Sequence, residues 1–401
     1  MEARKPAKPS QPAGWDLTAG QLWESGQRRE AIELTVRQIN RLAPAVPLDM
    51  SMQLSYYLFL VGDYRSAVNV LDNTHKHYPK NQEVLVNLAA CLSRAGMAAA
   101  AVDKARQVLA EDSENILAYD ILANNYHALG RIAEAAATGT KILELKDRHA
   151  GRPPENWQPP PPRPRDFSPG AGRRNIIVFS LWGSQPRYLR GALRNLLLAP
   201  DLYPGWICRF YLDDSVPAEF VDLIRLLGGQ ACLQPAGQSL RQKLCWRFLA
   251  ANDPGVGFFL IRDADSVINP RESRAVQAWL ESDAWFHVMR DWWTHTDLVL
   301  AGMWGGVSGI LPDMQKMLAA YHSGRAETPN IDQWFLRDRI WSCLRDITLV
   351  HDRCFTPAGA KPFPGNIPGG NYHVGQDESA ARPAWQAAFL QPWIERYSCL
   401  K

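Results

Sequence analysis

The sequence predicts a chain with two architectures, an array of paired helices followed by an α/β domain with a mostly parallel central sheet. Three observations predict it. Glycines recur about every 34 residues in the first part, a proline-rich stretch then interrupts the pattern, and short apolar segments alternate with amphipathic ones afterwards. We therefore predict a disordered tail at 1–14, helical repeats at 15–150, a linker at 151–172 and an α/β domain at 173–401.

The bulk composition is that of an ordinary globular protein. The 401 residues are 46% hydrophobic and 21% charged, with a formal net charge of +3, which does not favour a nucleic-acid partner. The seven cysteines are scattered and form no CxxC motif, which is typical of reduced thiols. The N-terminus lacks the apolar core of a signal peptide, and no apolar run is long enough to span a membrane. These features predict a cytoplasmic protein.

The first part of the chain carries an internal repeat. Gly26, Gly62, Gly96 and Gly130 follow one another at intervals of 36, 34 and 34 residues, and an alanine stands five residues after each. Glycine suits the turn between two helices, and a small residue lets the second helix cross close to the first. The spacing resembles the tetratricopeptide repeat, whose units stack into a superhelix with a concave face for a peptide or protein. A structural module without a ligand, or one that forms a homodimer, is the alternative.

The stretch between the repeats and the second part is rich in proline. Eight prolines lie between Arg152 and Gly170, four of them consecutive at 159–162. Such a run favours an extended polyproline II conformation, so we predict a semi-rigid spacer. Trp157 is expected to fix the spacer to one domain.

The second part alternates between predicted strands and helices. Strands are expected at 176–182, 206–212, 230–234, 258–261 and 286–289, with a further short strand ending at Asp352. Helices are expected at 188–198, 217–227, 240–250 and from Asn330 onward. This alternation predicts a mostly parallel sheet with helices on both faces.

Two aspartates follow the most apolar of these strands. Four apolar residues, Phe258 to Ile261, are followed by Arg262 and then by Asp263 and Asp265. Ligands bind at the carboxyl ends of parallel strands, so these carboxylates are expected beside a crevice. Two neighbouring carboxylates repel each other, and a divalent cation that holds a diphosphate relieves the repulsion. A simple turn is the structural alternative.

This pattern resembles the Asp-x-Asp motif of glycosyltransferases with the GT-A fold, and the resemblance covers residues 173 to about 380. It implies a nucleotide-sugar donor, most often a UDP-sugar, and Mn²⁺ or Mg²⁺ held by Asp263 and Asp265. It also implies His373, in a His-x-Gly setting, as a third metal ligand, with His351 as the rival.

The resemblance further implies a donor site built from the strand ends and from the helix before the metal-binding strand. The first strand's end would hold the nucleotide, an acid after the second strand would accept from base or ribose, and two cations would meet the phosphates. The predicted donor-binding residues are Ser180, Trp182, Gly183, Asp213, Lys243, Arg247 and Asp263. Their structural alternatives are a core tryptophan, a helix-capping acid and a solvated helix face. No GxGxxG or GxxxxGK[ST] motif occurs, which argues against a dinucleotide enzyme or a P-loop kinase.

Two acids are the candidate catalytic residues. Asp332 opens a predicted helix in a setting that resembles the second acidic motif of GT-A enzymes, where inverting members use the acid to deprotonate the acceptor hydroxyl. Asp291, with Arg290 and His295, is expected to face the donor sugar and the acceptor. A helix cap is the structural alternative for Asp332, and Asp338 is its rival.

The predicted function is a metal-dependent glycosyltransferase that moves a sugar from a nucleotide-sugar to an acceptor hydroxyl, on a protein or a glycan. The repeats are expected to recruit the acceptor or a protein partner. One alternative is a non-catalytic scaffold with a degenerate transferase domain. The other is a sugar nucleotidyltransferase, although the Gly-rich basic loop that such an enzyme carries after its first strand is missing here.

Overall fold

The chain falls into two units, Met1–Leu145 and Lys146–Lys401. The structure, a computed structural model, describes residues 12–164, 166–323, 328–366, 372–377 and 383–401. Most of the predicted disordered tail, residues 1–11, lies outside the described residues, as do residue 165 of the predicted linker and residues 367–371 of the Gly-rich loop before His373. Within the described ranges, no helix is long and apolar enough to cross a bilayer.

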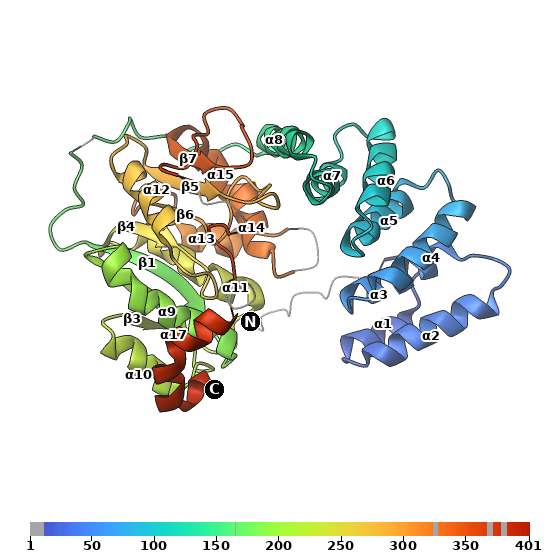
Figure 1. The fold of residues 1–401 in the computed structure, drawn as a ribbon, viewed down its shortest axis with the longest axis horizontal. Coiled ribbons are helices and arrows are strands. Elements are labelled where there is room, and N and C mark those ends of the chain that lie inside the picture. Colours follow the sequence, from blue (N-terminus) through green and yellow to red (C-terminus); the bar gives the residue numbers. More distant parts are fainter. Residues whose placement is uncertain (1–11, 165, 324–327, 367–371, 378–382) are drawn as a thin grey trace. The chain divides into compact units, whose positions relative to one another are not determined.

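The first unit is a succession of antiparallel helix pairs, shown in blue to teal in Figure 1. Each pair is joined by a tight turn, and each helix from α1 to α6 packs against the next one along the chain. The helices are α1 (Leu17–Glu24), α2 (Arg28–Arg41), α3 (Leu48–Leu60), α4 (Tyr64–His77), α5 (Gln82–Arg94), α6 (Ala98–Glu111), α7 (Ile116–Ala128) and α8 (Ile132–His149), the last of which continues past the division.

The repeating glycines and alanines have the roles that their spacing predicts. Gly26, Gly62, Gly96 and Gly130 all adopt a positive φ, between 72° and 85°, in the turns between paired helices. This backbone conformation favours glycine, because a Cβ would clash there. The alanine five residues after each glycine is fully buried in every repeat. The helical-repeat prediction is therefore confirmed for this unit.

The second unit is built on a seven-stranded sheet with the order β3-β2-β1-β4-β6-β5-β7. Four of its strand pairs are parallel, whereas β6 runs antiparallel to both β4 and β5. The sheet is therefore mixed, with one antiparallel strand inserted into an otherwise parallel arrangement. The strands are β1 (Arg174–Leu181), β2 (Trp206–Leu212), β3 (Gln230–Leu233), β4 (Val256–Ile261), β5 (Phe286–Arg290), β6 (Trp304–Val307) and β7 (Thr348–Asp352).

The antiparallel strand β6 lies in a segment that the sequence analysis did not assign to a strand. A Cβ on Gly305 would lie 2.5 Å from the carbonyl oxygen of Phe259, and one on Gly306 would lie 2.1 Å from the ring of Phe286. These glycines let bulky neighbours on β4 and β5 occupy the space that side chains would otherwise take. They also hide the strand signal, because glycine has low β propensity.

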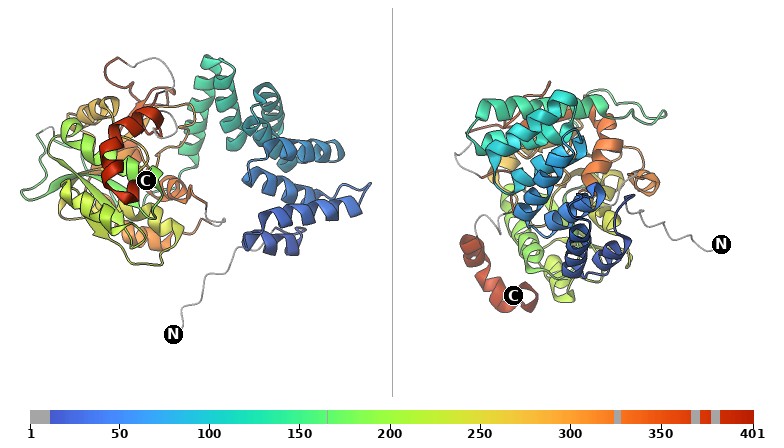
Figure 2. Two further views of the ribbon diagram at one scale, coloured as in Figure 1. Left: turned by 60° about the horizontal axis from the view of Figure 1, so that its bottom comes forward. Right: turned by 90° about the vertical axis from the view of Figure 1, so that its right-hand side faces the viewer.

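Helices cover both faces of the sheet (Figure 2). Successive residues of β4 point to opposite faces, so Phe258 packs against Trp279 of α12, while Phe259 packs against Trp304, which also contacts Phe248 of η1. The helical elements of this unit are α9 (Pro186–Leu202), α10 (Ala218–Leu226), α11 (Leu240–Cys245), η1 (Trp246–Asn252), α12 (Pro270–Leu280), α13 (Met314–Ala320), α14 (Ile331–Phe335), η2 (Leu336–Ile340), α15 (Trp341–Leu344), η3 (Arg345–Ile347), α17 (Pro383–Arg396) and η4 (Ser398–Leu400).

The proline-rich segment is bound to the second unit along much of its length. The Trp157 indole donates to the carbonyl of Ile310 at 3.1 Å, and the Trp285 indole donates to the carbonyl of Pro161 at 2.7 Å. Arg163 is buried, and Phe167 packs edge-on against Trp285. Trp157 therefore fixes the segment to the second unit, as expected from the sequence, and Pro161, Arg163 and Phe167 add further contacts with the same unit.

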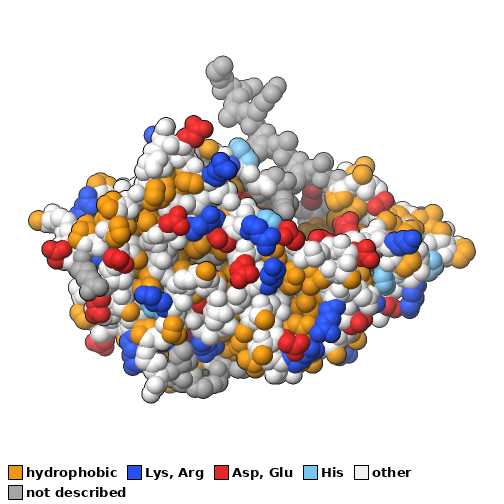
Figure 3. Space-filling model, turned by 90° about the horizontal axis from the view of Figure 1, so that it is seen from above, with side chains coloured by type: hydrophobic (Ala, Val, Ile, Leu, Met, Phe, Trp, Pro, Cys, Tyr) orange, Lys and Arg blue, Asp and Glu red, His pale blue; other side chains and the backbone are white. Residues whose placement is uncertain are grey.

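Charged side chains are mixed on the face drawn in Figure 3, where Lys and Arg are interspersed with Asp and Glu. This face therefore carries no large field of one sign among its described residues. The mixture agrees with the small formal charge of +3.

Candidate functional site

The residues predicted to bind the sugar donor lie where the strand order of the sheet reverses. Strands β2 and β3 follow β1 on one side and β4 lies on its other side, so the carboxyl ends of β1 and β4 meet at a topological switch point. Open α/β sheets bind ligands at such points, because the flanking connections diverge there and leave a crevice. Trp182 and Gly183 follow β1, and Asp263 and Asp265 lie just beyond β4.

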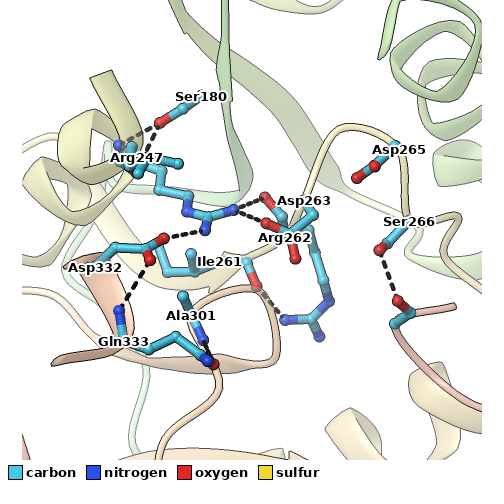
Figure 4. Close-up of polar contacts among 12 residues, drawn as sticks. Ser180, Arg247, Ile261, Arg262, Asp263, Asp265, Ser266, Ala301, Asp332 and Gln333 are labelled. Atoms are coloured by element: carbon cyan, nitrogen blue, oxygen red, sulfur yellow. Dashed lines mark hydrogen bonds and ion pairs between the residues drawn. The ribbon is translucent and has the colours of Figure 1, made fainter. Parts of the chain in front are cut away.

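Arg247 is a buried cation that joins two of the predicted acids. Its guanidinium donates to Asp263, to the carbonyl oxygen of Arg262 at 2.9 Å and to Asp332 at 3.0 Å. Its backbone N–H donates to the Ser180 hydroxyl at 3.1 Å. Figure 4 shows the Arg247 side chain extending between Asp263 and Asp332. Arg247 and Ser180 thus fix the ends of β1 and β4 to η1, and Arg247 does not share an exposed helix face with Lys243.

Asp263 is the more accessible acid of the pair. Its side chain is 43% exposed, against 14% for Asp265. Gly302 makes room for it, because a Cβ at that position would lie 2.0 Å from Asp263 Oδ2. One oxygen of Asp263 therefore faces Arg247, while the other occupies a space that only a glycine leaves open.

Asp265 has a different cationic partner. Arg187, in the first turn of α9, lies 2.5 Å from an Asp265 oxygen and 2.9 Å from an oxygen of Asp377. The turn that carries Asp265 is also bonded to the segment before Asp377, since the Ser266 hydroxyl donates to the carbonyl of Gly375 at 2.8 Å. The two aspartates of the pair thus have separate counter-ions.

The electrostatics of the acids follow from their burial. Burial raises the pKa of Asp265, and the nearby carboxylates of Asp263 and Asp377 raise it further, although Arg187 opposes them. Burial also raises the pKa of Asp332, an effect that Arg247 counters. Burial disfavours the Arg247 cation, but Asp263 and Asp332 more than compensate and raise its pKa, so this guanidinium stays charged.

A second polar group lies at the ends of β1 and β2. Lys243 of α11 donates to Asp213 at 2.6 Å, and the Ser215 hydroxyl accepts from the Gly183 N–H at 2.7 Å and donates to Asp213. Burial alone would raise the pKa of Asp213, but the hydrogen bonds from Lys243 and Ser215 lower it. Trp182 is half-buried, with its ring edge-on to Trp246. These groups connect the two strand ends that the prediction assigns to the nucleotide.

Asp291 and His373 form a different cluster. Asp291 is fully buried, accepts from Arg271 at 2.6 Å and from the Val374 N–H at 2.7 Å, and pairs with Arg353. The His373 ring stacks on Trp292, its Nδ1 lies 2.9 Å from the Val374 carbonyl oxygen, and burial lowers its pKa. Asp291 therefore anchors residues 372–377 to the end of β5.

The structure does not bring the three predicted metal ligands together. Asp263, Asp265 and His373 all belong to the described residues, and within these no three His, Cys, Asp or Glu side chains are grouped closely enough to hold a metal ion. The two alternative candidates have other partners. His351, the alternative to His373 as a metal ligand, pairs with the buried His287. Asp338, the alternative to Asp332 as the catalytic acid, accepts from the Tyr321 hydroxyl at 2.8 Å.

Two residues of this site had no signal in the sequence. Arg187 contacts Asp265 across 78 positions of the chain, and Gly302 packs against Asp263 across a distant loop. Arg187 follows Pro186 at a helix start and Gly302 lies in a glycine-rich run, but neither local pattern indicates which aspartate the residue contacts.

No protein-family model matches the chain, and no curated protein matches it. Solved structures resemble its N-terminal third. A MamA structure labelled MSR-1 is 23% identical, with a TM-score of 0.31, over 33% of this chain and 75% of its own. MamA from Desulfovibrio magneticus RS-1 is 19% identical, with a TM-score of 0.31, over 33% and 74%. YrrB, described as a TPR protein with an unusual peptide-binding site, is 16% identical, with a TM-score of 0.30, over 33% and 66%. Similarity this low assigns no activity to the chain.

Proposed function

We propose that the second unit is a metal-dependent glycosyltransferase that moves a sugar from a nucleotide-sugar, most simply a UDP-sugar, to an acceptor hydroxyl. The observation that carries the proposal is the position of Asp263 and Asp265, just past β4 and beside the carboxyl end of β1, where the strand order reverses. Ligands bind at such a point, and paired carboxylates there suit a cation that holds phosphates.

The pair fits a cation that also binds substrate phosphates. Mg²⁺ and similar ions are commonly held by one or two carboxylates, with phosphate oxygens and water completing the shell. Gly302 leaves the space that the outer oxygen of Asp263 occupies, and the raised pKa of Asp265 reflects burial and repulsion from Asp263 that a cation would relieve. Asp263 and Asp265 would hold the ion, which when bound neutralises the diphosphate leaving group.

The nucleotide side of the site has suitable groups at the ends of β1 and β2. Trp182 offers an aromatic face for a base, and the positive φ of Gly183 allows the backbone to turn there. Lys243 is tied to Asp213 and so is fixed near these strand ends, where its charge favours phosphate. Asp213 can accept from a base or ribose only through the carboxylate oxygens that already accept from Lys243 and Ser215.

Asp332 is the proposed base for the acceptor hydroxyl. Its raised pKa favours proton transfer, because a base works best when its pKa approaches the operating pH. Its bond to Arg247 also ties its charge to that of Asp263. Asp291, with three donors around it, acts in this proposal by holding residues 372–377 in place, and not by meeting substrate.

The repeats are proposed to recruit a protein partner or a protein acceptor. Stacked helix pairs present an extended surface that suits peptides and proteins. A cytoplasmic location is part of the proposal, since all seven cysteines are free thiols, as in a reducing compartment.

One observation favours a non-catalytic scaffold instead. Asp263 and Asp265 each have an arginine partner, so side chains of the chain itself balance the charge of the two acids. The two proposals differ in what purified protein does with nucleotide-sugars.

The deciding experiment is hydrolysis of a panel of nucleotide-sugars by the full chain with Mn²⁺, with Mg²⁺ and with EDTA. We expect UDP release that requires the metal and falls at least about a hundredfold in Asp265→Asn, because the carboxylate charge at the diphosphate is lost. Asp222→Asn, at an exposed acid on α10, is the matched control and should leave turnover unchanged. Absence of metal-dependent turnover across the panel, with no binding of any nucleotide-sugar, would favour the scaffold.

A further inference from the structure

Arg187 is shared between two acids that come from different parts of the chain. Its guanidinium lies within 2.9 Å of both Asp265, in the turn after β4, and Asp377, in the segment 372–377. The Arg187 side chain is 49% exposed, while those of Asp265 and Asp377 are 14% and 23% exposed. The cation is thus the most solvated member of the group, and the two acids are more buried.

Both acids are held by contacts that do not involve Arg187. Asp265 lies between Ala264, whose carbonyl packs against Gly191 of α9, and Ser266, which bonds to Gly375. Asp377 forms an isolated antiparallel bridge with Ser266, and the same segment is anchored through Val374 to the buried Asp291. If Arg187 moved away from Asp265, neither carboxylate would lose its backbone support.

Arg187 and a divalent cation compete for the same carboxylate. A guanidinium bonded to Asp265 occupies carboxylate lone pairs to which a metal ion would also bind, and two cations sharing one carboxylate repel each other. In the proposed reaction, Asp265 therefore gives up Arg187 when it takes a cation. The released guanidinium would then be available to pair with the diphosphate, for which a planar, permanently charged group is a suitable partner.

We propose that Arg187 is a positioning residue that couples cation binding to diphosphate binding. When no nucleotide is bound, Arg187 neutralises Asp265 and so weakens the binding of a cation on its own. When a nucleoside diphosphate arrives with the cation, Arg187 leaves Asp265 and pairs with the phosphates. This inference rests on the proposed function and identifies how that site would discriminate a metal–nucleotide complex from a free metal ion.

The test measures two affinities in the full chain, that of Mn²⁺ alone, from the electron paramagnetic resonance signal of the free ion, and that of UDP at saturating Mn²⁺, by calorimetry. In Arg187→Ala we expect Mn²⁺ alone to bind roughly fivefold tighter, because a competing positive charge is gone, and UDP to bind roughly fivefold more weakly. Opposite changes in the two affinities are not expected from a residue that only supports the fold.

Two further variants serve as controls. Arg187→Lys keeps the charge and should bind Mn²⁺ alone nearly as wild type does, and Arg225→Ala removes an exposed arginine that pairs with Asp222 on α10 and should change neither affinity. Thermal unfolding of each variant checks that it is folded.

The outcomes separate this inference from the proposed function. If wild type binds Mn²⁺ and UDP but Arg187→Ala binds Mn²⁺ no tighter, or binds UDP as well as wild type does, the coupling is wrong and the transferase proposal stands. If wild type and all variants bind neither Mn²⁺ nor UDP, both proposals fail.

Discussion

At the scale of single residues, Gly302 connects packing to the candidate chemistry. A Cβ there would lie 2.0 Å from Asp263 Oδ2 and 2.5 Å from its Cγ. Gly302→Ala should therefore displace the Asp263 carboxylate and weaken Mn²⁺–UDP binding by about tenfold or more, since a metal ligand moved by an ångström no longer completes its shell. Calorimetric titration with Mn²⁺ and UDP measures the effect.

Gly170→Ala is a matched control for this change. It adds the same methyl group, and a Cβ there would meet nothing within 4 Å. Neither glycine has a positive φ, so alanine strains neither backbone. Equal UDP affinity in Gly302→Ala and Gly170→Ala would show that the position of Asp263 does not matter for the ligand.

The buried histidine pair His287–His351 predicts a stability that depends on pH. The Nε2 of His287 lies 2.8 Å from the Nδ1 of His351. Burial, and for His287 also the neighbouring His351 and Arg262, lowers the pKa of His287 well below its ordinary value. Burial, together with Lys361, lowers the pKa of His351 to about 4. Both rings are therefore neutral in the folded state at neutral pH.

The sign of the effect follows from these lowered pKa values. A histidine whose folded-state pKa is depressed contributes its full stability above the unfolded value of 6.5, and loses it as pH falls from there towards the folded pKa. When the pH falls from 7 to 5, the free energy of unfolding should decrease by roughly 2 kcal/mol because of the lowered pKa of His351 alone. Urea unfolding at both pH values, with His351→Gln as the comparison, measures this. A wild-type pH dependence equal to that of His351→Gln would contradict it.

Residue by residue, the sequence is informative about where acids lie and much less about their partners. Asp263 and Asp265 follow a buried strand as predicted, because an apolar run that ends in acids is a local pattern. Their guanidinium partners come from η1 and α9, and His373 lies with Trp292 instead of the pair. Such pairings depend on how elements pack across long sequence distances, for which a single sequence carries no local signal.

At the scale of elements, the same contrast distinguishes β2 from β6. Trp206–Leu212 is a strand with the predicted bounds, since its apolar and aromatic residues favour a strand locally. Trp304–Val307 contains two glycines and is a strand only because β4 and β5 supply its partners and fill its space. Tertiary context decides the second case.

The proline-rich segment provides an element-scale prediction through Arg163. The buried guanidinium donates to the carbonyl oxygens of Trp279 and Leu280 at the end of α12, and to those of Ser282 and Ala284 in the loop that follows. A cation at a helix C-terminus also interacts favourably with the helix dipole. Arg163→Ala should lower the free energy of unfolding by about 3 kcal/mol, because several buried carbonyls lose their donor.

Urea unfolding measures the loss of stability in Arg163→Ala, and limited proteolysis shows whether the proline-rich segment detaches. The Arg163→Ala chain should be cut within residues 152–164 at protease concentrations that leave wild type intact. Arg152→Ala, at an exposed arginine of the same segment, is the control and should behave as wild type. Unchanged stability in Arg163→Ala would mean that the segment is only loosely associated.

At the scale of the whole molecule, the division into two units predicts where ligand binding stabilises the chain. The repeat unit has its own buried core, with Tyr57, Leu88 and Val102 among its members, and the candidate site lies wholly in the second unit. A ligand that binds only the folded second unit stabilises that unit by mass action, by about 2.7 kcal/mol at a hundred times its dissociation constant. Amide hydrogen exchange that requires unfolding of β1 and β4 should therefore slow by up to about a hundredfold with Mn²⁺ and UDP. Exchange in α3 to α6 should stay the same within error. If those helices slow by the same factor, the two units unfold as one, and stability at the candidate site is coupled to the repeats.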